Sequence, residues 1–302
     1  MTELLVALVP VFAVIAAGTV FRRVGFPGDG FWEPAEKLAY YVLLPALLVG
    51  NLAGADLAGL DVGRFILTVA GAFLAVGALL LVAGPRLRLG GAPFATAFMG
   101  SIRFNTYAGL AVVVSLFGDM GLTLFSVLIG VMIPLLNVMS VAALARFIRG
   151  GSAVQIAGML ARNPLVLGCL AGIAINLSGL GIHPVAAGVL EILGKAALGL
   201  ALLAVGAGLD LAALRGSIGL VAAASAVKLV AIPLAVAAAC RLTGVEGVPY
   251  MVAVLYAALP TSPQGYILAR QMGGDGPLIA AIVSATTAAS ILTIPLMLSL
   301  LA

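Results

Sequence analysis

The sequence predicts an all-α integral membrane protein of about ten transmembrane helices, arranged as two inverted five-helix repeats over residues 1–150 and 151–302. Three observations support this fold class. Hydrophobic residues make up 63% of the 302 residues and charged residues only 9%, far below the roughly 25% that gives a soluble domain its polar shell. Apolar runs long enough to cross a bilayer, about 20 residues each, occupy nearly the whole chain. Two of these runs are interrupted by polar residues at matching places in the two halves.

The apolar runs and the breakers between them predict the helix boundaries. Gly, Pro and Asp punctuate most of the short connections. Asn163-Pro164 is typical of a helix start, with a capping side chain followed by a first-turn proline, and residues 150–162 are expected to form a short surface helix ahead of it. The predicted membrane helices are 3–21, 36–55, 62–84, 93–117, 121–147, 164–180, 184–208, 217–240, 249–272 and 277–301.

Basic residues predict the orientation of these helices. Arginines gather in alternate loops, whereas the opposite loops are mainly acidic. By the positive-inside rule the arginine-bearing loops are cytoplasmic, so both termini are expected on the extracytoplasmic side. An odd number of helices per half then makes the two repeats inverted, as in many alternating-access transporters. The arginines concerned are Arg22, Arg23, Arg86, Arg88, Arg146, Arg149, Arg215 and Arg270.

The two interrupted runs contain the predicted binding site. One break, 103–109, reads Arg-Phe-Asn-Thr-Tyr-Ala-Gly, and the other, 259–265, reads Leu-Pro-Thr-Ser-Pro-Gln-Gly. Backbone that leaves the helix at mid-membrane needs partners from protein, water or a ligand. The new helix N-termini near Thr106 and Gln264 are expected to favour an anion. A broken helix in each half indicates a transporter's substrate site, although two structural kinks are the alternative.

The residues expected to contact substrate combine neutral hydrogen-bonding groups with positive charge. Arg103 lies near the membrane centre, where it either binds a carboxylate or pairs with backbone carbonyls to hold the break together. Lys228 lies near the middle of its helix and is expected to be functional, with a bond to the carbonyl end of a broken helix as the alternative. The predicted substrate-binding residues are Arg103, Asn105, Thr106, Pro260, Thr261, Ser262, Gln264 and Lys228.

Three further polar residues lie inside apolar helices. Glu191 and Lys195 have the spacing and order of a helical ion pair, and a self-neutralising pair is the preferred interpretation over a role in the site. Asn137 is expected to bond either to a break or substrate, or to a neighbouring helix of the scaffold.

No enzyme, cofactor, metal or nucleic-acid function is indicated. Cys169 and Cys240 form no Cys-x-x-Cys pair, and one histidine, His183, cannot make a metal cluster alone. No Gly-x-Ser-x-Gly motif, aspartate-rich pair or nucleotide-binding loop occurs, and the small net charge of +4 reports membrane orientation. The expected partners are a small-molecule substrate and membrane lipid.

Several motifs resemble those of the auxin efflux carrier family, and the resemblance extends along the whole chain. The family includes plant PIN-FORMED carriers and bacterial permeases for malate or malonate, and shares its fold with bile acid:sodium symporters. The motifs at and near the breaks are Arg103-Phe104-Asn105-Thr106, Gly118-Asp119, Ala258-Leu259-Pro260-Thr261 and Ala269-Arg270. Leu44-Pro45-Ala46-Leu47-Leu48, Asn163-Pro164 and the closing segment 284–295 resemble the bacterial branch.

The resemblance implies crossed broken helices 4 and 9, a scaffold of helices 1, 2, 6 and 7 that is often dimeric, and an elevator-like transport domain of helices 3–5 and 8–10. In the plant branch a proline-asparagine pair at each crossover contacts the substrate carboxylate. Here Asn105 and Pro260 match, but Phe104 and Thr261 replace the other two residues. These departures indicate a small organic anion other than auxin.

We therefore expect a multi-pass transporter of a bacterial inner membrane that moves a small carboxylate by alternating access. A sodium- or proton-coupled symporter of the same fold is one alternative, although no acidic residue lies beside either break to hold sodium. A membrane receptor that binds a small molecule without transporting it is another.

Overall fold

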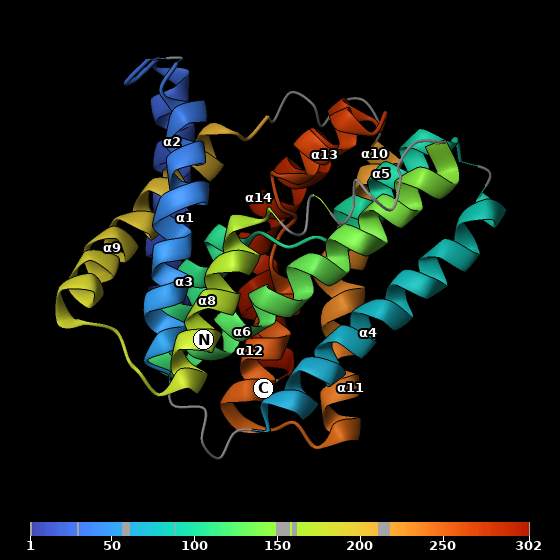
Figure 1. Cartoon of the computed structure of the whole chain (residues 1–302). Coiled ribbons are helices and arrows are strands. Elements are labelled where there is room, and N and C mark those ends of the chain that lie inside the picture. The colour runs from blue at the N-terminus through green and yellow to red at the C-terminus, as the bar shows by residue number, and fades with distance from the viewer. Residues whose placement is uncertain are drawn as a thin grey trace.

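The computed structural model describes residues 2–28, 30–55, 61–87, 89–148, 158, 162–210 and 218–301. Within these ranges every regular element is a helix and none is a strand (Figure 1). Arg88, Arg149, Arg215 and most of the expected surface helix at 150–162 lie outside the described residues. The helical stretches long and apolar enough to cross a membrane are Val62–Leu87, Gly91–Ile148, Pro184–Ala207, Ile218–Thr243 and Gly276–Leu301.

The first half of the chain forms helices close to the predicted ranges. A π-helical turn, Ala39–Leu43, joins α2 to α3, and the turn Gly84–Leu87 is a 3₁₀ extension of α4. Gly118, with φ of 55°, breaks the regular backbone inside α6 and so separates the two helices predicted over 93–117 and 121–147. The elements are α1 (Thr2–Arg23), α2 (Trp32–Leu38), α3 (Leu44–Ala53), α4 (Val62–Ala83), α5 (Gly91–Ile102) and α6 (Thr106–Ile148).

The described residues of the second half are also helical. A second π-helical turn, Val227–Ala231, joins α10 to α11. Asn163 caps α8 as predicted, because its Oδ1 accepts the N–H groups of Leu165 and Val166. The elements are α8 (Pro164–Ser178), α9 (Pro184–Ala207), α10 (Ile218–Ala226), α11 (Ile232–Thr243), α12 (Gly247–Ala258), α13 (Gly265–Gln271) and α14 (Gly276–Leu301).

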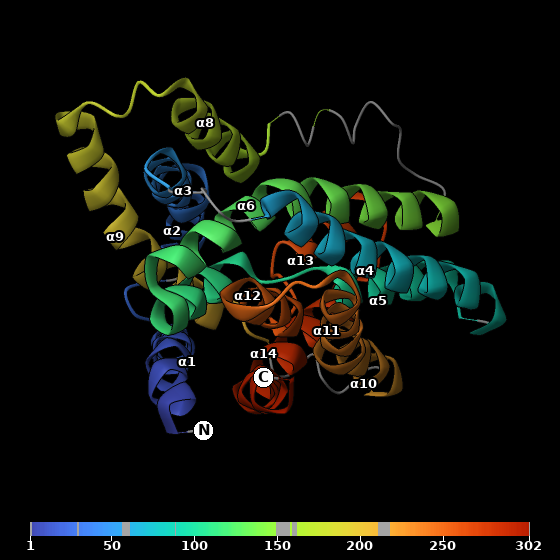
Figure 2. The ribbon, with the colours of Figure 1, turned by 90° about the horizontal axis from the view of Figure 1, so that it is seen from below.

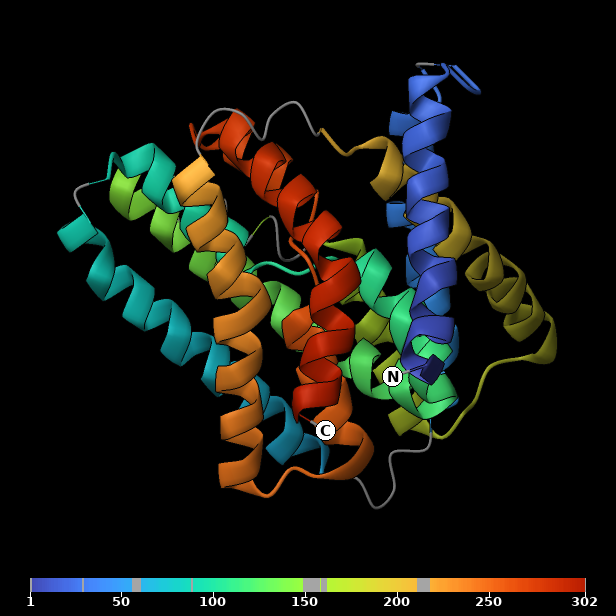
Figure 3. The ribbon, with the colours of Figure 1, turned by 180° about the vertical axis from the view of Figure 1, so that it is seen from behind.

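The helices form two groups that lie side by side. Helices α1, α2, α3, α8 and α9 pack together on one side, and α4, α5 and α10–α14 on the other, with α6 between them (Figure 2). Both termini lie at the same end of the molecule (Figures 1 and 3).

Candidate functional site

Both interrupted helices are broken in the structure, and the two breaks touch. Helix α5 ends at Ile102 and α6 begins at Thr106, while α12 ends at Ala258 and α13 begins at Gly265. The Asn105 N–H donates to the Pro260 carbonyl at 2.8 Å, so each non-helical segment supplies a partner for the other. The Thr261 hydroxyl donates to the Gly100 carbonyl at 2.6 Å, at the end of α5. These two bonds give partners within the protein to part of the backbone that the breaks expose, which a membrane interior favours.

Asn105 caps α6. Its Oδ1 accepts the N–H groups of Tyr107 and Ala108, both at 3.1 Å. The expectation of free N–H groups at this helix start is therefore wrong for these two donors. At the second break the first two N–H groups of α13 also have partners, because those of Gly265 and Tyr266 donate to the Ser262 and Pro263 carbonyls at 3.1 and 3.0 Å. Among the described side chains of the first break, the Asn105 Nδ2 is a buried donor without a hydrogen-bond partner.

Arg103 is the charged group of the breaks. Its Nη1 donates to the Asn137 Oδ1 at 2.7 Å, so Asn137 orients a break residue, one of the two roles expected for it. The Arg103 Nε is buried without a partner. Among the described residues no carboxylate pairs with this guanidinium, which leaves part of its charge and one donor uncompensated.

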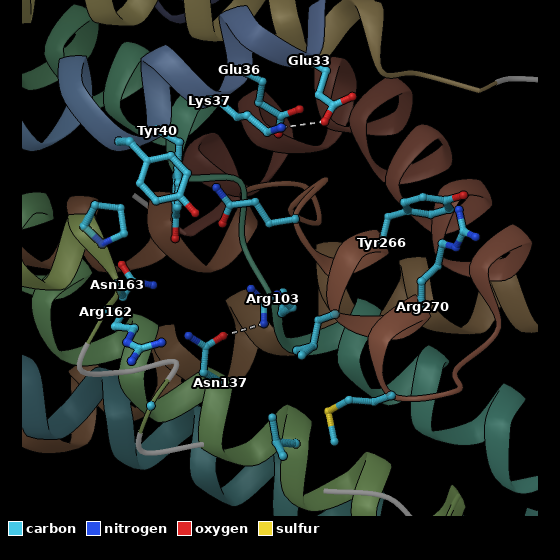
Figure 4. A pocket seen from close by; sticks show the side chains of 17 residues that line it. Glu33, Glu36, Lys37, Tyr40, Arg103, Asn137, Arg162, Asn163, Tyr266 and Arg270 are labelled. Carbon is cyan, nitrogen blue, oxygen red and sulfur yellow. Dashed lines mark hydrogen bonds and ion pairs between the residues drawn. The ribbon is translucent and has the colours of Figure 1, made fainter. Parts of the chain in front are cut away.

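Arg103 lies where two cavities meet. The larger has a volume of about 1150 Å³ and is lined by charged, amide and aromatic side chains from both helix groups (Figure 4). The smaller, about 20 Å³, is large enough for one water molecule. Thr106 and Ser262 line the smaller cavity, while Arg103, Asn137 and Gln264 line both. These three residues therefore form the inner end of the large cavity.

Not every predicted residue reaches a cavity. Gln264 does, and its Nε2 also donates to the Tyr107 Oη at 3.0 Å. Asn105, Pro260 and Thr261 instead hold the breaks together and line neither cavity. The predicted set thus divides into cavity residues and residues that shape the backbone.

Lys228 occupies a structural position. Its side chain is fully buried, and Nζ donates to the Ala257 carbonyl at 2.8 Å, at the C-terminal end of α12. The ammonium also lies 5.6 Å from the centroid of the Phe73 ring. Lys228 lines neither cavity. This is the alternative left open by the sequence, a lysine that bonds to the carbonyl end of a broken helix, rather than the functional role expected.

Glu191 and Lys195 lie away from the site. They form an ion pair at 2.6 Å, and both side chains are exposed on the outer face of α9. The geometry is that of the self-neutralising pair preferred from the spacing.

The structure adds cavity residues that the sequence reasoning missed. Glu36 and Tyr40, one helical turn apart, line the large cavity from the segment that leads into α3, and Asn163, Tyr266 and Arg270 line it from other elements (Figure 4). Glu36 lies at the start of a predicted membrane helix, between Glu33 and Lys37, where the sequence does not distinguish an acid in solvent from one that faces a cavity.

Two comparisons with known proteins agree with this picture. A family model described as "Membrane transport protein" matches residues 153–298. The chain is also 25% identical over 298 residues to a protein of Methanothermobacter thermautotrophicus named "Uncharacterized transporter", covering 95% of this chain and 94% of that one. Together with the long apolar helices, these similarities support a multi-pass membrane transporter.

Proposed function

We propose that this protein is a secondary transporter or uniporter for a small organic anion, a carboxylate, which binds at the inner end of the large cavity between the two breaks. The observation that carries the proposal is the state of Arg103. A guanidinium at the meeting point of two broken helices lacks a carboxylate partner among the described residues and has a buried, unpartnered Nε. A carboxylate matches the planar donor fork of arginine better than any neutral ligand.

The energetics favour a ligand at this place. A positive charge near the bilayer centre costs about 2.5 kcal/mol or more, and a buried donor without a partner costs about 1–3 kcal/mol. A carboxylate bound to Arg103 would reduce the first cost and remove the second. Gln264 and, through the small cavity, Thr106 and Ser262 would supply neutral hydrogen bonds around it.

The mechanism we propose is elevator-like alternating access on two inverted five-helix repeats. Helices α1–α3, α8 and α9 would form the scaffold, and α4–α6 and α10–α14 the moving part. Because an inside-negative potential favours outward movement of a monoanion by about 2.3 kcal/mol per 100 mV, export would need no coupled ion. The setting would be a bacterial inner membrane with both termini outside.

A homodimer through the scaffold is part of the proposal. Charged groups within membrane helices face protein or water rather than lipid, yet Glu191 and Lys195 lie exposed on the outer face of α9. A second copy packed on this face would shield the pair from lipid. Light scattering of the purified protein in detergent is expected to give the mass of a dimer. A protein that is monomeric both in detergent and in lipid nanodiscs would contradict the proposed homodimer.

The test is ligand stabilisation of the purified full chain. Thermal unfolding is measured with a panel of small carboxylates and with sodium, because a ligand that binds only folded protein raises the melting temperature. We expect one carboxylate to stabilise the protein, and Arg103→Ala to weaken its binding at least tenfold. Arg103→Lys, which keeps the charge but not the fork, should retain part of the affinity. Arg86→Ala, at a helix end outside both cavities, is the matched control.

Flux in proteoliposomes completes the test. Uptake of the stabilising carboxylate is expected in wild type and in Arg86→Ala, and is expected to be lost in Arg103→Ala. Normal binding and flux in Arg103→Ala would overturn the site. Stabilisation by sodium, with flux that depends on sodium, would replace the uniporter by a cation-coupled symporter.

A further inference from the structure

We propose that the small cavity between the two breaks is a second binding site, one that holds a single monatomic anion such as chloride. The cavity lies where the breaks meet, because Thr106 lines it from the first break and Ser262 from the second. The inference goes beyond the proposed function, since this ion would bind whether or not a carboxylate is present in the large cavity.

The volume of the small cavity limits the size of its ligand. The cavity measures about 20 Å³, and one water molecule already needs ~10–15 Å³ of such space. A carboxylate, with a carbon and two oxygens, does not fit as a whole. The apolar side chains of Phe104, Ile133 and Leu136 form the rest of the wall, so a charge bound here is poorly screened.

Two hydroxyl groups of the wall have no hydrogen-bond partner within the described part of the chain. They belong to Thr106 and Ser262, which are each only 5% exposed. By contrast, the buried Ser140 hydroxyl on α6 donates to the Leu136 carbonyl at 2.6 Å. Because buried polar groups in proteins are nearly always hydrogen-bonded, the two unpaired hydroxyls favour a polar ligand in this cavity.

Arg103 decides between an anion and a water molecule. Its Nη1 donates to the Asn137 Oδ1 at 2.7 Å, and its Nε is a buried donor without a partner. None of the described carboxylates forms a salt bridge with it. A water molecule would satisfy the hydroxyls but leave the guanidinium charge uncompensated, whereas an anion accepts the hydrogen bonds and also neutralises the charge.

The two amides of the wall do not reverse this preference. The Asn137 Oδ1 is engaged by Arg103, so the group that remains on this side chain is a donor, Nδ2. Gln264 donates through Nε2 to the Tyr107 Oη at 3.0 Å, which leaves an acceptor, Oε1. The lining therefore offers a guanidinium, an amide donor and two hydroxyls against one acceptor, a set that matches an ion that only accepts hydrogen bonds.

This ion would compete with the proposed carboxylate. Both anions would neutralise the same guanidinium, and two negative charges beside it repel each other strongly in a low dielectric. By linkage, chloride lowers the affinity for the carboxylate by the same factor as the carboxylate lowers the affinity for chloride. Chloride is therefore expected to inhibit carboxylate binding.

The experiment measures halide binding to the purified full chain in detergent. Thermal unfolding is followed as potassium methanesulfonate, whose anion is too large for the small cavity, is replaced by potassium chloride or bromide at constant ionic strength. Both halides are expected to stabilise the wild type. Ser262→Ala and Thr106→Val should each weaken halide binding about tenfold, as expected for a lost hydrogen bond to a charged group.

Ser140→Ala is the matched control, because it also removes a buried hydroxyl but one that lines neither cavity. This variant should bind halides as the wild type does. Halide stabilisation that is the same in Ser262→Ala, Thr106→Val and Ser140→Ala would overturn the site.

Bromide also gives a direct readout, because its anomalous scattering locates the ion in crystals. One peak is expected within hydrogen-bond distance of the Thr106 and Ser262 hydroxyls. A water molecule in the cavity at saturating bromide would contradict the inference. If that happens while a carboxylate still binds through Arg103, the proposed function stands alone. If chloride binds at this site and no carboxylate binds at all, the inference stands and the proposed function fails.

Discussion

At the scale of single residues, Lys228 shows how a buried charge can serve the fold instead of the ligand. Helix α12 ends inside the molecule, so its last carbonyls have no intrahelical donors. The Lys228 ammonium bonds to one of these carbonyls, that of Ala257, and its positive charge faces the negative end of the α12 dipole. The second break is therefore held open partly by a side chain that never reaches the cavity.

We predict that Lys228→Met destabilises the protein without removing the ligand site. Methionine fills a similar volume but leaves the Ala257 carbonyl unpaired, a loss of about 1–3 kcal/mol in the free energy of unfolding. The melting temperature in detergent should fall, while the affinity of the remaining folded protein for its carboxylate changes less than threefold.

Lys195→Met is the control for that prediction, because it removes an exposed lysine from an ion pair on α9 and should lower the melting temperature less. An unchanged melting temperature in Lys228→Met, accompanied by a tenfold loss of affinity, would return Lys228 to the substrate site.

The sequence located the breaks but could not assign each residue its role. Placing a polar residue in the middle of a membrane costs free energy, so Arg103, Asn105 and Lys228 could be identified as candidates from their positions within apolar runs. Which way each one points depends on a partner far along the chain: Asn137 for Arg103, and Ala257 for Lys228. Glu36 was missed because a helix start can place an acid either in solvent or in a cavity, and the hydropathy pattern does not distinguish the two.

At the scale of elements, α1 and α9 pack closely enough for their backbones to touch. A Cβ built on Gly206 would overlap the Ile15 carbonyl, and one on Gly18 would overlap the Leu203 carbonyl. The Thr19 hydroxyl adds a hydrogen bond to the Gly206 carbonyl at 2.8 Å. Small residues and an interhelical hydroxyl are the usual means of holding membrane helices together, since lipid provides no hydrophobic driving force between them.

We predict that Gly206→Ala lowers stability by about 1–3 kcal/mol, because the added methyl group meets backbone atoms, which cannot rotate away as side chains do. The loss should appear in thermal unfolding of the purified protein. Gly71→Ala in α4 is the control, since a Cβ there has nothing within 4 Å and the exchange should be neutral or slightly stabilising. Equal melting temperatures for the two variants would show that α1 and α9 are not closely packed.

The ends of the helices were predicted well where Gly, Pro or Asp residues separate the apolar runs. The helix geometry was not predicted where a proline lies inside an apolar run. The π-helical turns at Ala39–Leu43 and Val227–Ala231 were not foreseen. Each lies just before a proline, Pro45 and Pro233, whose ring would clash with the carbonyl four residues earlier in a regular helix. The wider π turn contains that carbonyl in both cases and relieves the clash.

At the scale of the whole molecule, exposed residues of the cavity lining mark its mouth, and Glu33, Tyr266 and Arg270 are among them. Helices α2 and α13, which carry these residues, lie at the end of the molecule away from both termini (Figure 1). The arginine-rich ends of α1 and α6 carry Arg22, Arg23 and Arg146. If the positive-inside rule holds for these residues, the cavity faces the cytoplasm in this conformation.

We predict that cysteine labelling will show this polarity. The native Cys169 and Cys240 are buried and should not react with a membrane-impermeant maleimide. Tyr266→Cys, at the cavity mouth, should be labelled from the cytoplasmic side, and Leu180→Cys, which is 88% exposed in the α8–α9 connection, from the opposite side. The measurement is the extent of maleimide labelling of each variant in right-side-out and in inside-out membrane vesicles.

The same cysteines separate orientation from conformational change. Labelling of both positions from the same side would contradict the topology, because the α8–α9 connection and the cavity mouth lie at opposite ends of the fold. A saturating carboxylate should slow the labelling of Tyr266→Cys, either by occupying the cavity or by favouring its closure, and should leave Leu180→Cys unaffected. Closure would hide the cavity mouth, whereas an occupying ligand hides only the inner end at Arg103. A ligand that is too small to reach Tyr266 but still slows the labelling of Tyr266→Cys would therefore indicate that binding moves one helix group against the other.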